Sequence, residues 1–290
     1  MAKRFLVGRP LSSAEADHQR LPKTIALATF SSDPISSTAY ATEEILFVTA
    51  VGGSSLALGL TKLIPMAIAV AILLTIVVVS YRQTIVAYPS GGGAYIVSRE
   101  NLGEYPSLIA AASLLIDYVL TVAVSVSAGV AAIVSLDAIR GLEEDRVLLC
   151  LFFVVLLTAG NLRGLKESGK IFAAPTYVYI VFLTLLVGYG LFRVFFGDID
   201  PVPFDAERAE DVAQAGGSLS LFLVLRGFSS GAVALSGVEA ISNGIPAFRK
   251  PESKNAATTL TTMAFISASC SSEFRSWPVT SSHIPPTPRP

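Results

Sequence analysis

Oxygen-bearing side chains interrupt an apolar stretch near the N-terminus. The run TFSSDPISSTAYATEE places Asp33, Pro34, Tyr40 and several hydroxyls among apolar residues. An ionisable group inside a bilayer costs several kcal/mol unless it lines a cavity or is paired. Pro34 lacks a backbone N–H and disfavours helix at Asp33, so we predict a binding site at a break in the helix. A proline kink with a capping aspartate near the membrane edge is the alternative.

A second group of oxygen ligands is expected further along the chain. Asp117, Thr121 and Ser125 are spaced by four in ASLLIDYVLTVAVSVSAG, and Tyr118 adjoins them. Residues with this spacing stack on one helix face. The stripe predicts a wall of carboxylate and hydroxyl oxygens. Hydrogen bonding between helices through small polar residues is the alternative.

A third group lies in FSSGAVALSGVEAISNGIP. Gly231, Gly237 and Gly244 interrupt this apolar run, which also holds Ser236 and Glu239. Two interrupted helices five spans apart are typical of inverted-repeat transporters whose site lies at the two breaks. We therefore expect this segment to face residues 29–44.

The combined inventory contains oxygen donors and no nitrogen or sulfur cluster. His18 and His283 lie near the two ends, and Cys150 and Cys270 are far apart in apolar context. Oxygen ligands suit a hard, weakly polarising cation better than a transition metal. We predict no transition-metal site and no cofactor, and the absence of hydrolase and redox signatures argues against an enzyme.

The composition shows what must position these residues. The chain has 290 residues, of which 52% are hydrophobic and 15% charged, and its mean hydropathy is +0.62. Soluble domains have about 25% charged residues, so we predict an all-α integral membrane protein. Segments long enough to span are expected at about 24–51, 59–81, 107–136, 147–162, 172–196 and 218–243, and a shorter seventh begins near residue 256.

Between the second and third spans, YPSGGGAY contains the triple glycine Gly91 to Gly93. It lacks the lysine and the following Ser/Thr of a phosphate-binding P-loop. We interpret it as a turn at the membrane surface.

Basic residues are distributed unevenly between alternate loops, which predicts the orientation. With the N-terminus inside, the cytoplasmic stretches hold Lys3, Arg4, Arg9, Arg20, Lys23, Arg82, Arg99, Arg163, Lys166, Lys170, Arg249, Lys250 and Lys254. The outer stretches hold Lys62, Arg140, Arg146, Arg193 and Arg208. This asymmetry follows the positive-inside rule. No cleavable signal peptide is apparent, so we expect a multi-pass cell-membrane protein with a cytoplasmic N-terminus.

Three regions are expected from these patterns. Residues 1–23 form a basic cytoplasmic lead, residues 24–266 a partial transmembrane transporter domain, and residues 267–290 a Ser/Pro-rich tail. The tail cannot continue a helix, and we expect a truncated or frame-shifted product. A native disordered tail is the alternative.

Several of these motifs are long enough to carry a family resemblance. The runs RFLVGRPL, SSDPISSTAY, SYRQTIVAYPSGGGAYIVSRENLGEYPSLIA, LLIDYVLTVAVSVSAG, NLRGLKESG and LSGVEAISNGIPAF resemble the KimA-type potassium importers of the amino acid–polyamine–organocation (APC) superfamily. The similarity extends from about Arg4 to Thr262. It implies a LeuT-like fold of inverted repeats, of which this chain holds about the first six to seven transmembrane helices, and potassium uptake coupled to protons.

The resemblance also implies roles for individual residues. Potassium ligands would come from Asp33, Tyr40, Tyr118, Thr121, Ser125 and Ser236. The family has a threonine where Ser236 stands, and the serine keeps the hydroxyl oxygen. Asp117 and Glu239 would supply charge or carry protons, since burial disfavours the charged form of a carboxylate.

Two other functions are kept open. A proton-coupled amino acid permease of the same superfamily would bind a substrate carboxylate where Asp33 stands, and the charge of Asp33 disfavours this. A non-transporting membrane sensor or scaffold, or an inactive fragment, is the further alternative. The expected partners are K⁺ and H⁺ as substrates, the lipid bilayer and, left open, a second copy in a homodimer. No nucleic-acid partner is expected.

Overall fold

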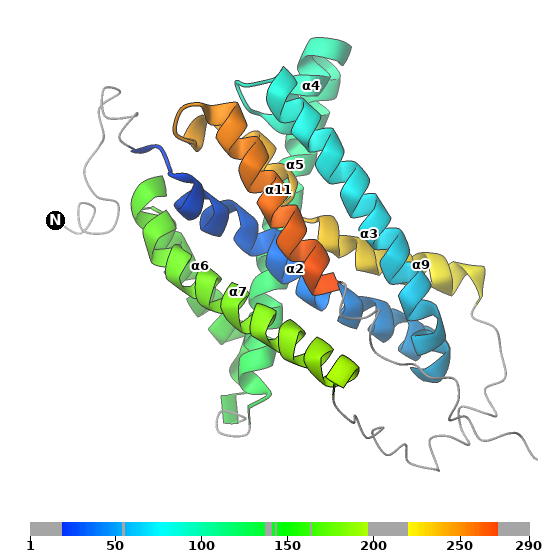
Figure 1. The fold of residues 1–290 in the computed structure, drawn as a ribbon. Coiled ribbons are helices and arrows are strands. Elements are labelled where there is room, and N and C mark those ends of the chain that lie inside the picture. Colours follow the sequence, from blue (N-terminus) through cyan, green and yellow to red (C-terminus); the bar gives the residue numbers. More distant parts are fainter. Residues whose placement is uncertain are drawn as a thin grey trace, which may run out of the picture. The chain divides into compact units, whose positions relative to one another are not determined.

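The computed structural model describes residues 19–53, 56–136, 141–142, 144–162, 164–196 and 220–271, and the named elements in these ranges are all helical. Residues 1–18 and 272–290, where most of the expected lead and tail fall, lie outside the described residues. The helices (Figure 1) are α2 (Lys23–Gly53), α3 (Leu56–Ala87), α4 (Gly93–Leu102), α5 (Glu104–Val134), α6 (Arg146–Asn161), α7 (Leu165–Phe196), α9 (Leu221–Gly231), η3 (Ala232–Leu235), α10 (Glu239–Asn243), η4 (Ile245–Ala247) and α11 (Glu252–Ser271).

Helices occupy every range that the apolar pattern predicts. Within the described residues, four of them are long and apolar enough to cross a membrane: Leu63–Ala87, Glu104–Val134, Lys166–Arg193 and Leu221–Asn243. The apolar helix α6 is shorter, with 16 residues. The last helix, α11, continues to Ser271, past the expected end of the seventh apolar segment at residue 266.

The chain forms two compact units, and four of the described helices have residues in both. The first unit comprises Met1–Ser37, Val77–Tyr179 and Ser236–Ala264, and the second comprises Thr38–Ile76, Ile180–Leu235 and Phe265–Pro290. The boundaries fall within α2, α3, α7 and α11.

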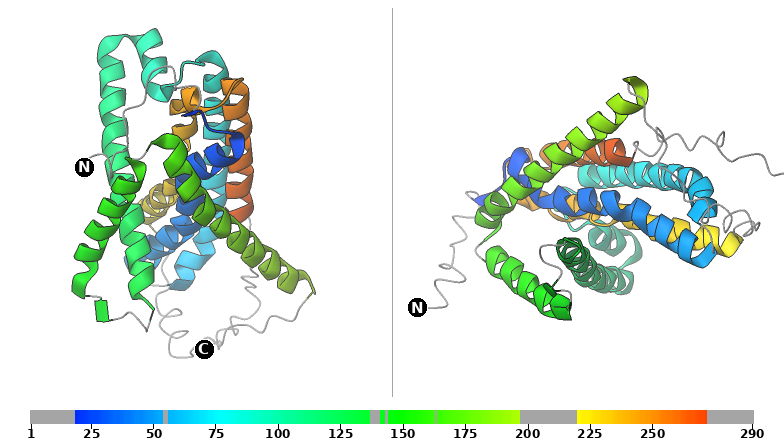
Figure 2. Two further views of the ribbon diagram at one scale, coloured as in Figure 1. Left: turned by 90° about the vertical axis from the view of Figure 1, so that its left-hand side faces the viewer. Right: turned by 90° about the horizontal axis from the view of Figure 1, so that it is seen from below.

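In the first unit, α4 packs against α5 and α10, and α5 packs along α6 (Figure 2). The segment before α2 pairs with the segment after α10. Leu21 N–H donates to the carbonyl of Ala247 at 2.7 Å, and Arg249 N–H donates to the carbonyl of Leu21 at 3.1 Å. The rings of Phe30 and Phe248 stack with their centroids 5.4 Å apart. These contacts fix the start of α2 beside the second part of the sixth span.

In the second unit, the described parts of α2, α3 and α9 share an apolar core. Ile45, Leu63 and Met66 are buried together, and Val224 packs against them. Close approach depends on Gly231, because a Cβ there would lie 2.5 Å from Ile45 Cδ1. This core holds the second half of α2 against the first part of the sixth span.

The predicted break in the first span is absent, because α2 is a continuous helix with Pro34 inside it. Hydroxyl groups along the helix bond to its carbonyls. Thr29 Oγ1 donates to the carbonyl of Ile25 at 2.8 Å, and Ser36 Oγ donates to the carbonyl of Asp33 at 2.9 Å. Pro34 lacks the N–H that would bond to the carbonyl four residues earlier, and the helix continues in spite of this loss.

The predicted interruption in the sixth span is confirmed. The α-helix α9 gives way to η3, residues 236–238 form a turn, and α10 begins at Glu239. Gly237 has φ +79°. A residue with a Cβ is strained in this left-handed region, so glycine at this position permits the turn.

Candidate functional site

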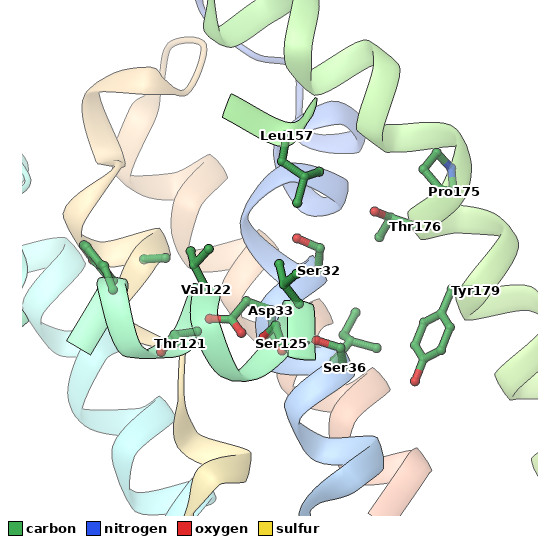
Figure 3. Close-up of a pocket in the computed structure, with 14 residues that line it drawn as sticks. Ser32, Asp33, Ser36, Thr121, Val122, Ser125, Leu157, Pro175, Thr176 and Tyr179 are labelled. Atoms are coloured by element: carbon green, nitrogen blue, oxygen red, sulfur yellow. Dashed lines mark hydrogen bonds between the residues drawn. The ribbon is translucent and has the colours of Figure 1, made fainter. Parts of the chain in front are cut away.

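A pocket of about 570 Å³ lies within the first unit, and four of the predicted site residues line it. Figure 3 shows the labelled side chains, which come from α2, α5, α6 and α7. The complete lining is Ser32, Asp33, Ile35, Ser36, Tyr118, Thr121, Val122, Ser125, Val126, Leu157, Pro175, Thr176, Tyr179 and Ala240. One carboxylate and several hydroxyls thus lie in a wall that is otherwise apolar.

Asp33 supplies the carboxylate of the pocket. It is half-buried, and Oδ1 accepts a hydrogen bond from Ser37 Oγ at 3.2 Å, one turn further along α2. This bond fixes the orientation of the carboxylate, because the donor lies on the same helix. The charge of Asp33 thus has a defined position at the pocket.

The turn in the sixth span lies directly against Asp33. A Cβ on Gly237 would lie 2.9 Å from Asp33 Cγ and 2.9 Å from Pro34 Cδ, and it would overlap Asp33 Oδ2. Gly237 therefore provides both the conformation of the turn and the space for the carboxylate. Asp33 and Pro34, in the first part of the polar run, thus lie against the interruption of the sixth span.

Helix α5 brings three of its predicted ligands to the pocket: Tyr118, Thr121 and Ser125. Thr121 Oγ1 and Ser236 Oγ are 3.1 Å apart and share a hydrogen bond. Ser236 does not line the pocket in the described structure. It belongs to the turn of the sixth span, so this bond ties α5 to the interruption.

Asp117 and Tyr40 are placed differently from the other predicted ligands. Asp117 is exposed, and neither residue is among those that line the pocket. Side chains four residues apart on an α-helix point about 40° away from each other, whereas side chains seven residues apart point in almost the same direction. Tyr118 is therefore nearly aligned with Ser125, while Asp117 is turned away from it. Tyr40 is half-buried and belongs to the second unit.

Glu239 begins α10 next to the lining residue Ala240. It is 7% exposed, and Oε1 has no hydrogen-bond partner within the described structure. The negative charges of Asp33, Asp117 and Glu239 are close enough to repel one another. No three acidic, His or Cys side chains among the described residues are grouped closely enough to share a metal ion.

Several pocket residues were not predicted from the sequence. Thr176 and Tyr179 on α7 form the wall opposite α5 (Figure 3), and Ser32 and Ser36 flank Asp33 on α2. The two serines lie in the polar run, so that run was an available signal. Thr176 and Tyr179 lie in an apolar segment, where nothing in the residue pattern identifies the face toward the pocket.

The hydrogen bond between Thr121 and Ser236 leads to a test. Replacing Ser236 with alanine leaves Thr121 Oγ1 without this partner, and one neutral hydrogen bond contributes about 1 kcal/mol. We expect the free energy of unfolding to fall by about 1 kcal/mol in S236A, and S236T, which keeps the hydroxyl, to retain it. Thermal unfolding of the purified protein measures the effect; equal unfolding temperatures in S236A and the unmodified protein would show that the bond does not stabilise the fold.

The comparisons with known proteins agree on one class of protein. The family described as amino acid permease matches residues 22–270. The chain is also 50% identical over 266 residues to the potassium transporter KimA of Bacillus subtilis (strain 168), and the match covers 92% of this chain. It covers 42% of the relative, so the chain spans about two fifths of that protein's length.

These matches bear on the resemblance seen in the motifs. They confirm the resemblance to potassium importers of this type and the all-α, multi-pass membrane fold expected from it. Both the family and the relative are transporters, which confirms that no enzyme is to be expected.

Proposed function

Because the chain belongs to the amino acid permease family of membrane transporters, we propose that it takes part in potassium uptake coupled to protons. The observation that carries this proposal is the position of Asp33. Its carboxylate lies against the turn of the sixth span, in a pocket that also holds hydroxyl oxygens. A fixed negative charge among neutral oxygens suits a monovalent cation of low field strength.

The proposed ligands act by replacing the hydration shell of K⁺. Oxygens of Asp33, Tyr118, Thr121 and Ser125 are available at the pocket, and Ser236 contributes through its bond to Thr121. The carboxylate offsets the cost of removing water from the ion. Tyr40, which does not line the pocket, stays a ligand only as the family resemblance implies it.

Glu239 is the proposed proton carrier, with Asp117 as a second acidic group. Glu239 is buried, and one of its oxygens has no hydrogen-bond partner in the described structure. A buried carboxylate without a counter-ion is favoured in its neutral form. Protonation of Glu239 together with binding of a cation beside Asp33 would then couple the two movements in the same direction.

Replacing Glu239 with glutamine tests this role. The amide fits the same space but cannot release a proton, so proton-driven rubidium uptake should fall to background while the protein still accumulates in the membrane. Uptake would be measured in liposomes with and without a proton gradient directed inward, that is, with the lower pH outside. If the gradient accelerates uptake equally in E239Q and the unmodified protein, Glu239 does not carry the proton.

The same proposal assigns an orientation. The distribution of basic residues between alternate loops supports a cytoplasmic N-terminus. The segment before α2 and the segment after α10, which pair through Leu21, would then both lie at the cytoplasmic face.

Amino acid transport is the second proposed function, and one observation favours it. The pocket volume of about 570 Å³ exceeds that of a single ion, and much of its wall is apolar. Against it, Asp33 would repel the carboxylate of an amino acid. Uptake of labelled rubidium and of labelled amino acids by cells that lack their own carriers separates the two. Saturable rubidium uptake without amino acid uptake supports the first proposal, and the opposite result supports the second.

A further inference from the structure

Asn243, the last residue of α10, is linked to the pocket by a hydrogen bond to a side chain that lines it. It does not line the pocket itself, but its Nδ2 donates a hydrogen bond to Tyr118 Oη at 2.5 Å. Tyr118 lines the pocket and is 37% exposed. A side chain with so much exposed surface is held weakly by packing, so this bond has a large share in fixing its hydroxyl.

Asn243 is in turn held by the triple glycine between α3 and α4. Gly91, Gly92 and Gly93 have φ values of +77°, +96° and +46°. Gly92 N–H donates to the backbone carbonyl of Asn243 at 3.3 Å. This loop is thus more than a surface turn, because it binds the end of α10.

The fit between the loop and Asn243 leaves no room for a side chain. A Cβ on Gly93 would lie 3.1 Å from Asn243 Cγ and would overlap Oδ1, and a Cβ on Gly91 would lie 2.9 Å from the carbonyl oxygen of Asn243. Asn243 Oδ1 is buried, with no hydrogen-bond partner in the described structure. Shape, rather than a hydrogen bond to Oδ1, therefore fixes the amide and directs Nδ2 toward Tyr118.

The bond determines what the tyrosine hydroxyl offers to a ligand. A hydroxyl has one proton and two acceptor positions. The amide of Asn243 occupies one acceptor position, which leaves the other lone pair for a cation. Together with the bond between Thr121 and Ser236, it ties α5 to both ends of the segment from residue 236 to residue 243.

From these contacts we infer that Asn243 is a positioning residue for the cation ligand Tyr118. The glycines Gly91 to Gly93 hold Asn243, and Asn243 holds the Tyr118 hydroxyl at the pocket. The inference rests on the proposed function, because it assigns Tyr118 to the cation site. Ion affinity depends on the placement of the coordinating oxygens, so loss of Asn243 should act on affinity through Tyr118.

A double-mutant cycle of Asn243 and Tyr118 tests this directly. In the full-length protein in liposomes, N243A should raise the KM for rubidium about fivefold, as expected for one hydrogen bond, with the maximal rate changed less than about twofold. In the Y118F background, where no hydroxyl remains to be positioned, N243A should leave the KM unchanged. N243S, which cannot reach Tyr118 Oη, provides the same comparison if N243A does not accumulate.

A glycine variant tests the loop separately. G93A introduces a Cβ that displaces Asn243, so it should raise the KM as N243A does, and this effect should also vanish in Y118F. G164A is the matched control, because Gly164 has φ +108° but nothing lies within 4 Å of an added Cβ. It has the same kind of backbone strain without the contact, and its KM should not change.

The outcomes separate the inference from the proposed function. An unchanged KM in N243A, or an equal KM increase in both backgrounds, would overturn the positioning role while rubidium uptake still supports a potassium transporter. An absence of saturable rubidium uptake by the unmodified protein would overturn the proposed function itself.

Discussion

Replacing Asp33 with asparagine should abolish measurable rubidium uptake. Asparagine has nearly the same shape and can still accept from Ser37 Oγ, so the side-chain geometry is preserved. The negative charge beside Gly237 is lost, and a hydrogen bond or ligand contact to a charged group contributes about 2 kcal/mol. Cation affinity should therefore fall about 30-fold or more. Initial rates of rubidium uptake into liposomes, at several rubidium concentrations, measure the change.

The matched control for D33N is E44Q, which removes one negative charge from the same helix. Glu44 is exposed and does not line the pocket. Its replacement should change the KM for rubidium less than about twofold, since Glu44 lies outside the pocket, eleven residues further along α2 than Asp33. If D33N and E44Q have the same uptake as the unmodified protein, Asp33 is not an ion ligand.

The second large effect is expected at Gly237. Alanine there meets two obstacles: φ +79° strains the backbone, and the added Cβ collides with the carboxylate of Asp33 and with Pro34. The conformational strain costs about 1–2 kcal/mol. Displacement of Asp33 adds to this, so we expect G237A to lose uptake and to unfold at a lower temperature. Uptake and thermal unfolding of the purified protein are the two measurements.

G103A separates the collision from the strain. Gly103 has φ +98°, and no atom lies within 4 Å of a Cβ added there. It should show a decrease in unfolding temperature but retain rubidium uptake. A G237A variant that transports as well as G103A would mean that Asp33 is not confined by the sixth-span turn.

Local residue patterns were sufficient to predict most of the helices and one of the two interruptions. Gly237 could be identified because a glycine in an apolar helix run signals a turn, and the turn is present. Pro34 was misleading. A proline removes one backbone hydrogen bond from a helix, and whether the helix continues past it depends on the packing around it, which the local sequence does not specify.

Only those pocket residues that helical spacing assigns to one face could be predicted from the sequence. Thr121 and Ser125 were assigned to one face and do line the pocket, but the centre of that face is nearer to Tyr118 than to Asp117. The exact rotation of a helix depends on its neighbours. The pocket residues on α7 could not be predicted, because a single sequence does not show which helices are adjacent in the fold.

Asn243 shows another limit of the sequence. Its place in SNGIP gave no sign of a role, because its importance comes from the triple glycine about 150 residues earlier. The contact between Asn243 and the triple glycine exists only in the folded chain. There, all three glycines have a positive φ, and two of them face atoms of α10 or of the following turn. Long-range packing of this kind follows from the fold and not from local propensity.

Direct binding of rubidium to the purified full-length protein tests whether the pocket beside Asp33 binds potassium. Radioactive rubidium should bind saturably, potassium should displace it, and a mixture of amino acids should not. D33N should lose this binding, while E44Q should retain it. Rubidium binding that persists in D33N, or saturable binding of a labelled amino acid in place of rubidium, would contradict the account.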